Sequence, residues 1–210
     1  MIASHDSFTY LKPKNPLFNL ISIFWKCQKL DITEQYNLGV RIFDVRVYRY
    51  KNQWGVAHGM VHFDFYFKSL LTLCEYFIKN YPDSYIRIYL EDNVNNKNEN
   101  IKEIFLKETE YVKSIFKDII WEIGTHFPWI TYYRNDKLPF DNIKEYYCHL
   151  FNWNTDRGFW YNIKHFDWSS WCLPLFAKKH NPPLTTEMKY STTMHILDYI
   201  GIYPKTKELD

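Results

Sequence analysis

Apolar segments of two alternating kinds, between residues 40 and 123, constrain the fold of this chain more than any other feature. One kind is short, rich in β-branched and aromatic residues, and followed by polar or glycine residues, as strands are. The other kind repeats its apolar side chains every three and four residues, as helices do. The predicted strands are 1–4, 40–48, 54–57, 85–90 and 119–123, and the predicted helices are 63–81 and 101–116. Strands that alternate with helices favour an α/β fold with a parallel sheet.

Outside this region the sequence gives fewer signals. A short helix is predicted over residues 31–39, because Asp31 and Glu34 have the spacing of a capping box and Gly39 suits a helix stop. After residue 125 the periodicity fades. Strands are still predicted at 149–153 and 194–200, and a loop is predicted at 174–183.

Charged and titratable side chains gather at the ends of three predicted strands. His5 and Asp6 follow the first strand, Asp44 and Arg46 lie on the second, and His58 follows the third. Side chains alternate along a strand, so Asp44 and Arg46 point to the same side. One interpretation is a structural ion pair. The other is a site in which the arginine faces an anion while two histidines transfer protons, as imidazoles do near neutral pH.

Length, charge and cysteine spacing limit the classes of protein that fit. A chain of 210 residues suits one domain, 1–210, with a full hydrophobic core. A net charge of +2 gives no strong electrostatic case for a nucleic-acid partner, and we expect a monomer. The four cysteines are widely spaced and show no ligand spacing with histidines, so neither a zinc site nor a disulfide framework is predicted.

Targeting segments are not evident in the sequence. No secretory signal precedes His5, and no apolar run reaches the roughly 20 residues that a membrane span needs. We therefore expect a protein that is cytoplasmic or released without a cleavable signal, unless the chain as given lacks its natural beginning.

Five short motifs, taken in order, resemble the catalytic X-domain of phosphatidylinositol-specific phospholipase C in its bacterial form. They are Ser4-His5-Asp6-Ser7-Phe8, Lys14-Asn15-Pro16, Arg41-Ile42-Phe43-Asp44-Val45-Arg46, Ala57-His58-Gly59 and Leu197-Asp198-Tyr199-Ile200. The resemblance is close over residues 1 to 92 and thin from there to the final strand. Any one motif alone is a weak signal, whereas the paired motifs in this order are specific.

The resemblance implies a small TIM-like (β/α) barrel, in which some helices are missing or replaced by loops. Such barrels place their active sites at the carboxyl ends of the strands, which is where the histidines fall. It also implies roles in cleaving a phosphodiester. His5 would be the base, oriented by Asp198, and His58 would be the acid, supported by Asp6. Arg46, held by Asp44, would stabilise charge on the phosphoryl oxygens.

One position departs from the bacterial pattern. The bacterial enzymes place an inositol-contacting lysine at the end of the fourth strand, where this chain has Glu91. Eukaryotic members have a calcium-binding glutamate there, so Asp6, Asp44 and Glu91 are an alternative calcium site. Because Arg46 puts positive charge in the cation's place, we expect no metal cofactor, with Glu91 pairing with Arg46 or with a substrate hydroxyl.

The remaining inferences concern the substrate. Asn152 and Arg157 are candidates for lining the pocket, although each could equally be a surface or core residue. The apolar segment 16–25 is either a buried loop or core helix, or an amphipathic rim element that dips into a lipid interface, with Trp25 and Lys26 suited to that position. The expected reaction converts phosphatidylinositol-like lipids to diacylglycerol and a cyclic inositol phosphate. The alternatives are action on another phospholipid or soluble phosphodiester, and an inactive headgroup-binding module.

Overall fold

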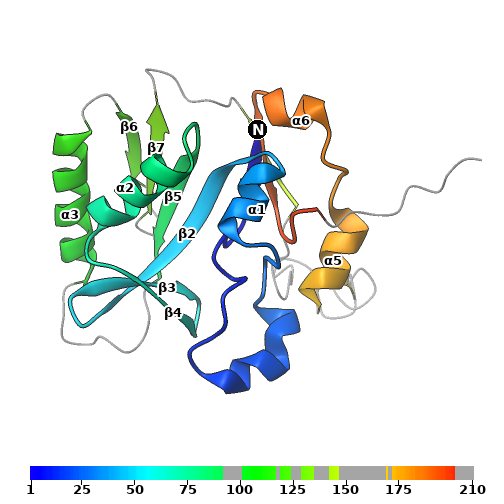
Figure 1. Ribbon diagram of the computed structural model, residues 1–210, viewed down its shortest axis with the longest axis horizontal. Coiled ribbons are helices and arrows are strands. Elements are labelled where there is room, and N and C mark those ends of the chain that lie inside the picture. The colour runs from blue at the N-terminus through cyan, green and yellow to red at the C-terminus, as the bar shows by residue number, and fades with distance from the viewer. Residues whose placement is uncertain are drawn as a thin grey trace, which may run out of the picture.

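The computed structural model describes residues 1–91, 101–116, 119–123, 129–134, 142–146, 169 and 172–201. Within them, nine strands form one sheet, and helices pack beside it (Figure 1). The strands are β1 (Ile2–Ser4), β2 (Val40–Tyr50), β3 (Gln53–His58), β4 (Val61–Phe67), β5 (Tyr85–Leu90), β6 (Ile119–Ile123), β7 (Trp129–Arg134), β8 (Asn142–Glu145) and β9 (Thr193–Leu197). The helices are η1 (Pro16–Phe24), α1 (Ile32–Asn37), α2 (Leu70–Asn80), α3 (Ile101–Ile115), α5 (Leu173–His180) and α6 (Thr186–Tyr190). The predicted α/β class is confirmed.

The centre of the sheet is parallel, as the alternation of strands and helices predicts. The strand order is β6-β7-β5-β2-β1-β9-β8, and the strands from β5 to β8 on this path are parallel neighbours. The structure departs from the predicted parallel sheet at two places. β3 and β4 extend from β2 as antiparallel neighbours, and β6 and β7 pair antiparallel at one end. In the part of the chain that is described, the end strands β6 and β8 do not pair, so the sheet is open there.

The helix predicted over residues 63–81 is wrong in its first part. Residues Val61–Phe67 form β4, and α2 begins only at Leu70. Phenylalanines at every second position of β4 give the period of a strand, which the apolar content of the segment hides. Ser69 then starts the helix, because its side chain accepts from the backbone N–H of Thr72 while the Thr72 hydroxyl accepts from the N–H of Ser69.

Other elements divide between confirmed and missed. The predicted helix at 31–39 is α1, with Asp31 and Glu34 forming the capping box, and β5 has its predicted bounds. The predicted loop at 174–183 is wrong, because most of it belongs to α5, whose Pro174 lies in the first turn, where proline is tolerated. The sequence did not indicate β7, β8 or α6. The strand predicted at 149–153 lies outside the described residues.

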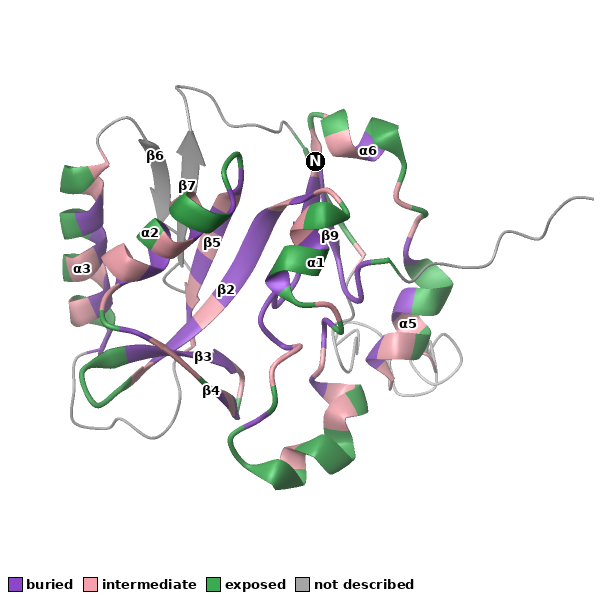
Figure 2. Ribbon diagram, viewed as in Figure 1, coloured by how far each residue is buried: buried purple, intermediate pink, exposed green. Residues whose placement is uncertain are grey.

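The apolar segment 16–25 does not form a core helix. It forms η1, in which no residue is buried, and Leu17 and Leu20 are 68% and 82% exposed. Figure 2 shows this element as a mostly green and pink coil beyond the purple strands of the sheet. Trp25, expected at the rim, is instead buried against Phe63. None of the helices in the described ranges combines the length and apolar character required to cross a bilayer.

A carboxylate on α3 connects the antiparallel extension of the sheet to the start of α2. Glu108 Oε2 accepts from Trp54 Nε1 at 2.8 Å and from the backbone N–H of Leu70 at 2.9 Å, while its Oε1 lies 3.2 Å from Arg49 Nη1. One side chain thus satisfies the buried indole of β3 and the first N–H of α2, which has no partner within the helix. This contact joins β3, which ends at His58, to α2 and α3.

We predict that Glu108→Gln lowers the free energy of unfolding by roughly 1–3 kcal/mol. The amide NH₂ group of glutamine cannot accept a hydrogen bond, so at least one of the three donors that contact Glu108 loses its acceptor. The matched control is Glu110→Gln on the same helix, where Glu110 forms an exposed ion pair with Lys113. Loss of that ion pair should lower the free energy of unfolding by under about 0.5 kcal/mol. Urea denaturation measures both. Equal losses in the two variants would contradict the role given to Glu108.

Candidate active site

The candidate site lies where two strands succeed each other along one edge of β2. Because β5 pairs with β2 over Ile42–Val47, both β1 and β3 occupy the opposite edge, β1 as far as Phe43 and β3 from Val47 onward. The segment after β1 fills the interval between them, and the backbone N–H of Ser7 donates to the Asp44 carbonyl at 2.8 Å. The end of β1 is therefore fixed beside Asp44 and Arg46.

The backbone turn at Asp6 brings consecutive side chains to the same place. Asp6 has a φ of 45°, in the left-handed region that aspartate tolerates better than most residues. Successive side chains of an extended strand would point to opposite faces. Here both His5 and Asp6 reach Arg46, and each is almost fully buried. Strain of this kind persists where the surroundings fix it, as they do at functional sites.

His5 is held at both ring nitrogens. Nδ1 lies 2.7 Å from Asp198 Oδ1, and Nε2 lies 2.8 Å from Arg46 Nη2. Because a guanidinium can only donate, Nε2 accepts in this contact and Nδ1–H donates to the carboxylate. This tautomer leaves the lone pair of Nε2 directed at the guanidinium.

His58 lies at the end of β3 and is oriented by the main chain. Its Nδ1 donates to the carbonyl of Trp25 at 2.6 Å, since a carbonyl can only accept. Its Nε2 lies 3.3 Å from Asp6 Oδ2, which is also 3.4 Å from His5 Nε2. The two rings lie 6.4 Å apart, centroid to centroid. Both histidines therefore present Nε2 to one carboxylate oxygen.

Arg46 lies between three carboxylates. Its Nε lies 2.7 Å from Asp6 Oδ1 and 3.5 Å from Asp44 Oδ2, and its Nη1 lies 3.2 Å from Glu91 Oε1. The contact with Asp6 is an ion pair and not an aligned hydrogen bond. The expected pairing of Glu91 with Arg46 is present, and Asp44 and Arg46 do share one face of β2. The same three carboxylates make up the alternative calcium set.

Charge pairing in the site outweighs burial. Burial works to lower the pKa of His5, but the carboxylates of Asp6 and Asp198 raise it above its ordinary value. Burial works to raise the pKa of Asp6, but Arg46 and the two histidines hold it below its ordinary value. For Arg46, burial is outweighed by Asp6, Asp44 and Glu91, which raise its pKa. The cluster thus pairs a guanidinium with carboxylates beside a histidine that gains a proton readily.

Three side chains that support the site were missed by sequence reasoning. Gln28 is fully buried, and its amide donates to the carbonyls of His5 and Leu197, which ties the ends of β1 and β9 together. Asn181 donates to the carbonyl of Asp198 at 2.6 Å. Cys27 lies with its sulfur 3.7 Å from Asp6 Oδ2. Each comes from a segment without a strand or helix pattern, so no periodicity indicated these three residues.

A fourth missed residue did have a signal. The ring of Tyr89 lies 5.3 Å from the guanidinium carbon of Arg46. On β5 it is two residues before Glu91, so the alternation of the predicted strand places both on one face. The register that pairs Arg46 with Tyr89 completes the contact. The two other predicted pocket residues, Asn152 and Arg157, lie outside the described residues.

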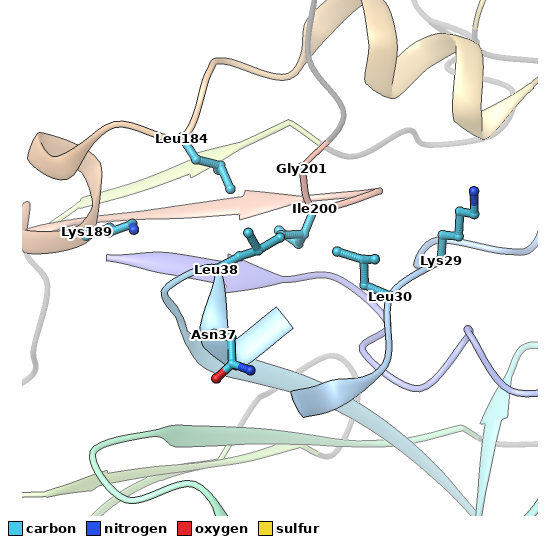
Figure 3. A pocket seen from close by; sticks show the side chains of 8 residues that line it. All are labelled: Lys29, Leu30, Asn37, Leu38, Leu184, Lys189, Ile200 and Gly201. Atoms are coloured by element: carbon cyan, nitrogen blue, oxygen red, sulfur yellow. The ribbon is translucent and has the colours of Figure 1, made fainter. Parts of the chain in front are cut away.

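A pocket of about 540 Å³ lies elsewhere, beside α1 and α6 (Figure 3). Its lining is apolar apart from two lysines and one asparagine, and consists of Lys29, Leu30, Asn37, Leu38, Leu184, Lys189, Ile200 and Gly201. No member of the His5, Asp6, Arg46 and His58 cluster is among these residues. The pocket therefore lies apart from the cluster of titratable side chains.

Comparisons with known proteins bear on the fold. No protein-family model matches the sequence, and no curated protein matches it. A structure of phosphatidylinositol-specific phospholipase C from S. aureus aligns with 96% of this chain and 86% of its own, with a TM-score of 0.53 and 16% identity. The corresponding enzyme from Listeria monocytogenes aligns with 98% of this chain and 88% of its own, with 14% identity and a TM-score of 0.47, too low to add to the argument. The chain therefore has an α/β fold similar to the TIM-barrel-like fold of the S. aureus enzyme.

Proposed function

We propose that this chain cleaves the phosphodiester of phosphatidylinositol-like lipids, yielding diacylglycerol and a cyclic inositol phosphate. The observation that carries the proposal is the convergence of two imidazoles and one guanidinium around Asp6. Phosphodiester cleavage needs a base, an acid and a positive charge on the phosphoryl oxygens, and these three groups supply them. The shared fold and the sequence motifs around the same residues point in the same direction.

In the proposed reaction, the 2-hydroxyl of the inositol attacks the neighbouring phosphorus and gives its proton to His5 Nε2. The bond from phosphorus to the glycerol oxygen breaks, and that oxygen takes a proton from His58 Nε2. Asp198 stabilises the imidazolium that forms on His5, because their contact is 2.7 Å. The Trp25 carbonyl and Asp6 hold His58 with its Nε2 facing the site. Exchange with water afterwards removes the added proton from His5 and returns a proton to His58.

Arg46 takes the part of a metal ion in this proposal. Its guanidinium is planar and can match two phosphate oxygens, and Asp6, Asp44 and Glu91 fix it on three sides. A positive charge among these three carboxylates needs no second cation. We therefore propose catalysis without a metal cofactor, and calcium and chelator should both leave the rate unchanged.

We predict that His5→Ala and His58→Ala each lower the rate by a factor on the order of 10²–10⁴ while the fold is retained. The matched control is His180→Ala, since His180 is exposed at the end of α5, and it should retain activity. The measurement is release of cyclic inositol phosphate and diacylglycerol from phosphatidylinositol vesicles, with other phospholipids and soluble phosphodiesters as parallel substrates. Full activity in either alanine variant would refute the assignment. Binding of headgroup without any product would identify a binding module instead.

The pH dependence should report the environment of His5. A base must be unprotonated, and the pKa of His5 is raised above 6.5, so the acid limb of kcat/KM should lie above pH 6.5. Asp198→Asn removes one of the two carboxylates that raise this pKa, and the limb should then move to lower pH while the maximum rate falls. Asp6 gives no clean test because it also contacts Arg46 and His58. A limb that does not move in Asp198→Asn would show that another group controls it.

We also propose that η1 contacts the lipid surface. Its exposed side chains Leu17, Leu20, Ile21 and Ile23 form an apolar rim, and Trp25 at its end touches His58 through the main chain. Inserting one leucine side chain contributes up to roughly 1.5–3 kcal/mol. Leu17→Ser with Leu20→Ser should weaken vesicle binding about tenfold or more and spare a soluble phosphodiester. The control is Leu175→Ser, since Leu175 is an exposed leucine on α5. If this control weakens vesicle binding as much as the double variant does, η1 is not the lipid contact.

A further inference from the structure

Cys27 has no part in the proposed reaction, yet its thiol lies inside the candidate site. The sulfur is 3.7 Å from Asp6 Oδ2 and 3.9 Å from His58 Nδ1, and the residue is 1% exposed. His5, Asp6 and Cys27 present donor atoms that all lie within 4.8 Å of one another, and all three residues are buried. Because Cys27 follows Asp6 by 21 residues, no ligand spacing in the sequence indicates this cluster.

Two separations within the cluster are close to those between the ligands of a tetrahedral zinc ion. Zinc binds nitrogen and oxygen at about 2.0–2.1 Å and thiolate sulfur at about 2.3 Å, so neighbouring ligands of a tetrahedron lie about 3.3–3.6 Å apart. Here His5 Nε2 lies 3.4 Å from Asp6 Oδ2, and Cys27 Sγ lies 3.7 Å from the same oxygen. His58 Nε2 lies 3.3 Å from the same oxygen. Imidazole, carboxylate and thiolate together suit zinc better than a hard cation.

The second independent observation concerns the far nitrogen of each histidine. Histidines that bind metal donate their other N–H to a carboxylate or a backbone carbonyl, which fixes the ring and its tautomer. The Nδ1 of His5 faces Asp198 at 2.7 Å, and the Nδ1 of His58 faces the Trp25 carbonyl at 2.6 Å. Both rings therefore present Nε2 to Asp6 Oδ2, the oxygen that also lies 3.7 Å from Cys27 Sγ.

We propose that His5, Asp6 and Cys27 form a zinc site, with His58 or water as the fourth ligand, and that zinc binding excludes Arg46 from His5. The Asp6 carboxylate and the Cys27 thiolate balance the charge of the ion, and the thiol proton is released as the bond to sulfur forms. Arg46 Nη2 lies 2.8 Å from His5 Nε2, so the guanidinium and the ion compete for one lone pair. Glu91, on the more open side of Arg46, keeps the displaced guanidinium paired.

The site can be tested without any assay of activity. Co²⁺ added to the full chain should give the near-ultraviolet charge-transfer absorption of a cobalt–thiolate bond, saturating at one ion per chain and disappearing when Zn²⁺ replaces it. Cys27→Ser should abolish the band and weaken zinc binding by more than about 100-fold. Loss of a residue that only hydrogen-bonds to a metal ligand weakens binding by about 10–100-fold, so a larger effect marks Cys27 as a ligand. Cys172→Ser should keep the band. Absence of the band in the unaltered chain, or its survival in Cys27→Ser, would overturn the proposal.

A second variant leaves all three ligands in place. Arg46→Gln removes the competing cation, so the variant should bind zinc at least about tenfold more tightly. Tenfold is roughly the effect of one charge-assisted contact that zinc no longer has to displace. Unchanged or weaker binding in this variant, with its fold verified by circular dichroism, would contradict competition between Arg46 and the ion.

Inhibition by zinc rests on the proposed function and is tested separately. Zn²⁺ should stop cleavage of phosphatidylinositol vesicles, and a chelator should restore it. A chain that shows the cobalt band but never cleaves lipid keeps the zinc site and loses the proposed function. A chain that cleaves lipid and shows no band keeps the function and loses the zinc site.

Discussion

The guanidinium of Arg46, held between carboxylates, is the interaction on which the rest of the site depends. Asp6, Asp44 and Glu91 come from three segments, namely the turn after β1, the middle of β2 and the end of β5. Buried charges are costly unless they are paired. If these segments separated, each would leave a buried charge without its partner. The ion cluster thus fixes the relative positions of three strand ends, and the histidines take their places from those ends.

The sheet supplies the geometry that the cluster requires. β2 is long enough to pair with β1 along its first half and with β3 along its second half, so His5 and His58 approach Arg46 from either direction along one edge. The parallel centre of the sheet brings Asp198 alongside His5, because β9 pairs with β1 up to Ser4. The antiparallel extension, which the sequence pattern did not reveal, is what places His58.

The apolar rim and the site are in direct contact. η1 ends at Phe24, and the carbonyl of the next residue, Trp25, is the acceptor for His58 Nδ1. The indole of Trp25 donates in turn to the carbonyl of Phe18 within η1. A displacement of η1 would therefore reach one of the two imidazoles through two hydrogen bonds, and the surface proposed to meet lipid is also the segment that orients the proposed acid.

Much of the site could be predicted from the sequence because strand alternation and strand ends carry the information. Asp44 and Arg46 share a face by the period of two, and Glu91 follows a strand whose bounds were correct. Asp198 was placed beside His5 by resemblance and not by pattern. Cys27 and Gln28 could not be found, because their segment has no regular period and their contacts depend on tertiary packing. The strand β4 was missed since a run of aromatic residues satisfies both periods over a short window. Asn152 and Arg157 stay predictions.

The central claim is that His5, His58 and Arg46 face one phosphate-sized site. The most direct measurement is a nuclear magnetic resonance titration that follows the imidazole nitrogens of both histidines and the Nε–H of Arg46 while a soluble inositol phosphodiester is added. All three signals should shift with one common dissociation constant. Signals that respond with different constants, or a histidine that does not respond at all, would contradict it.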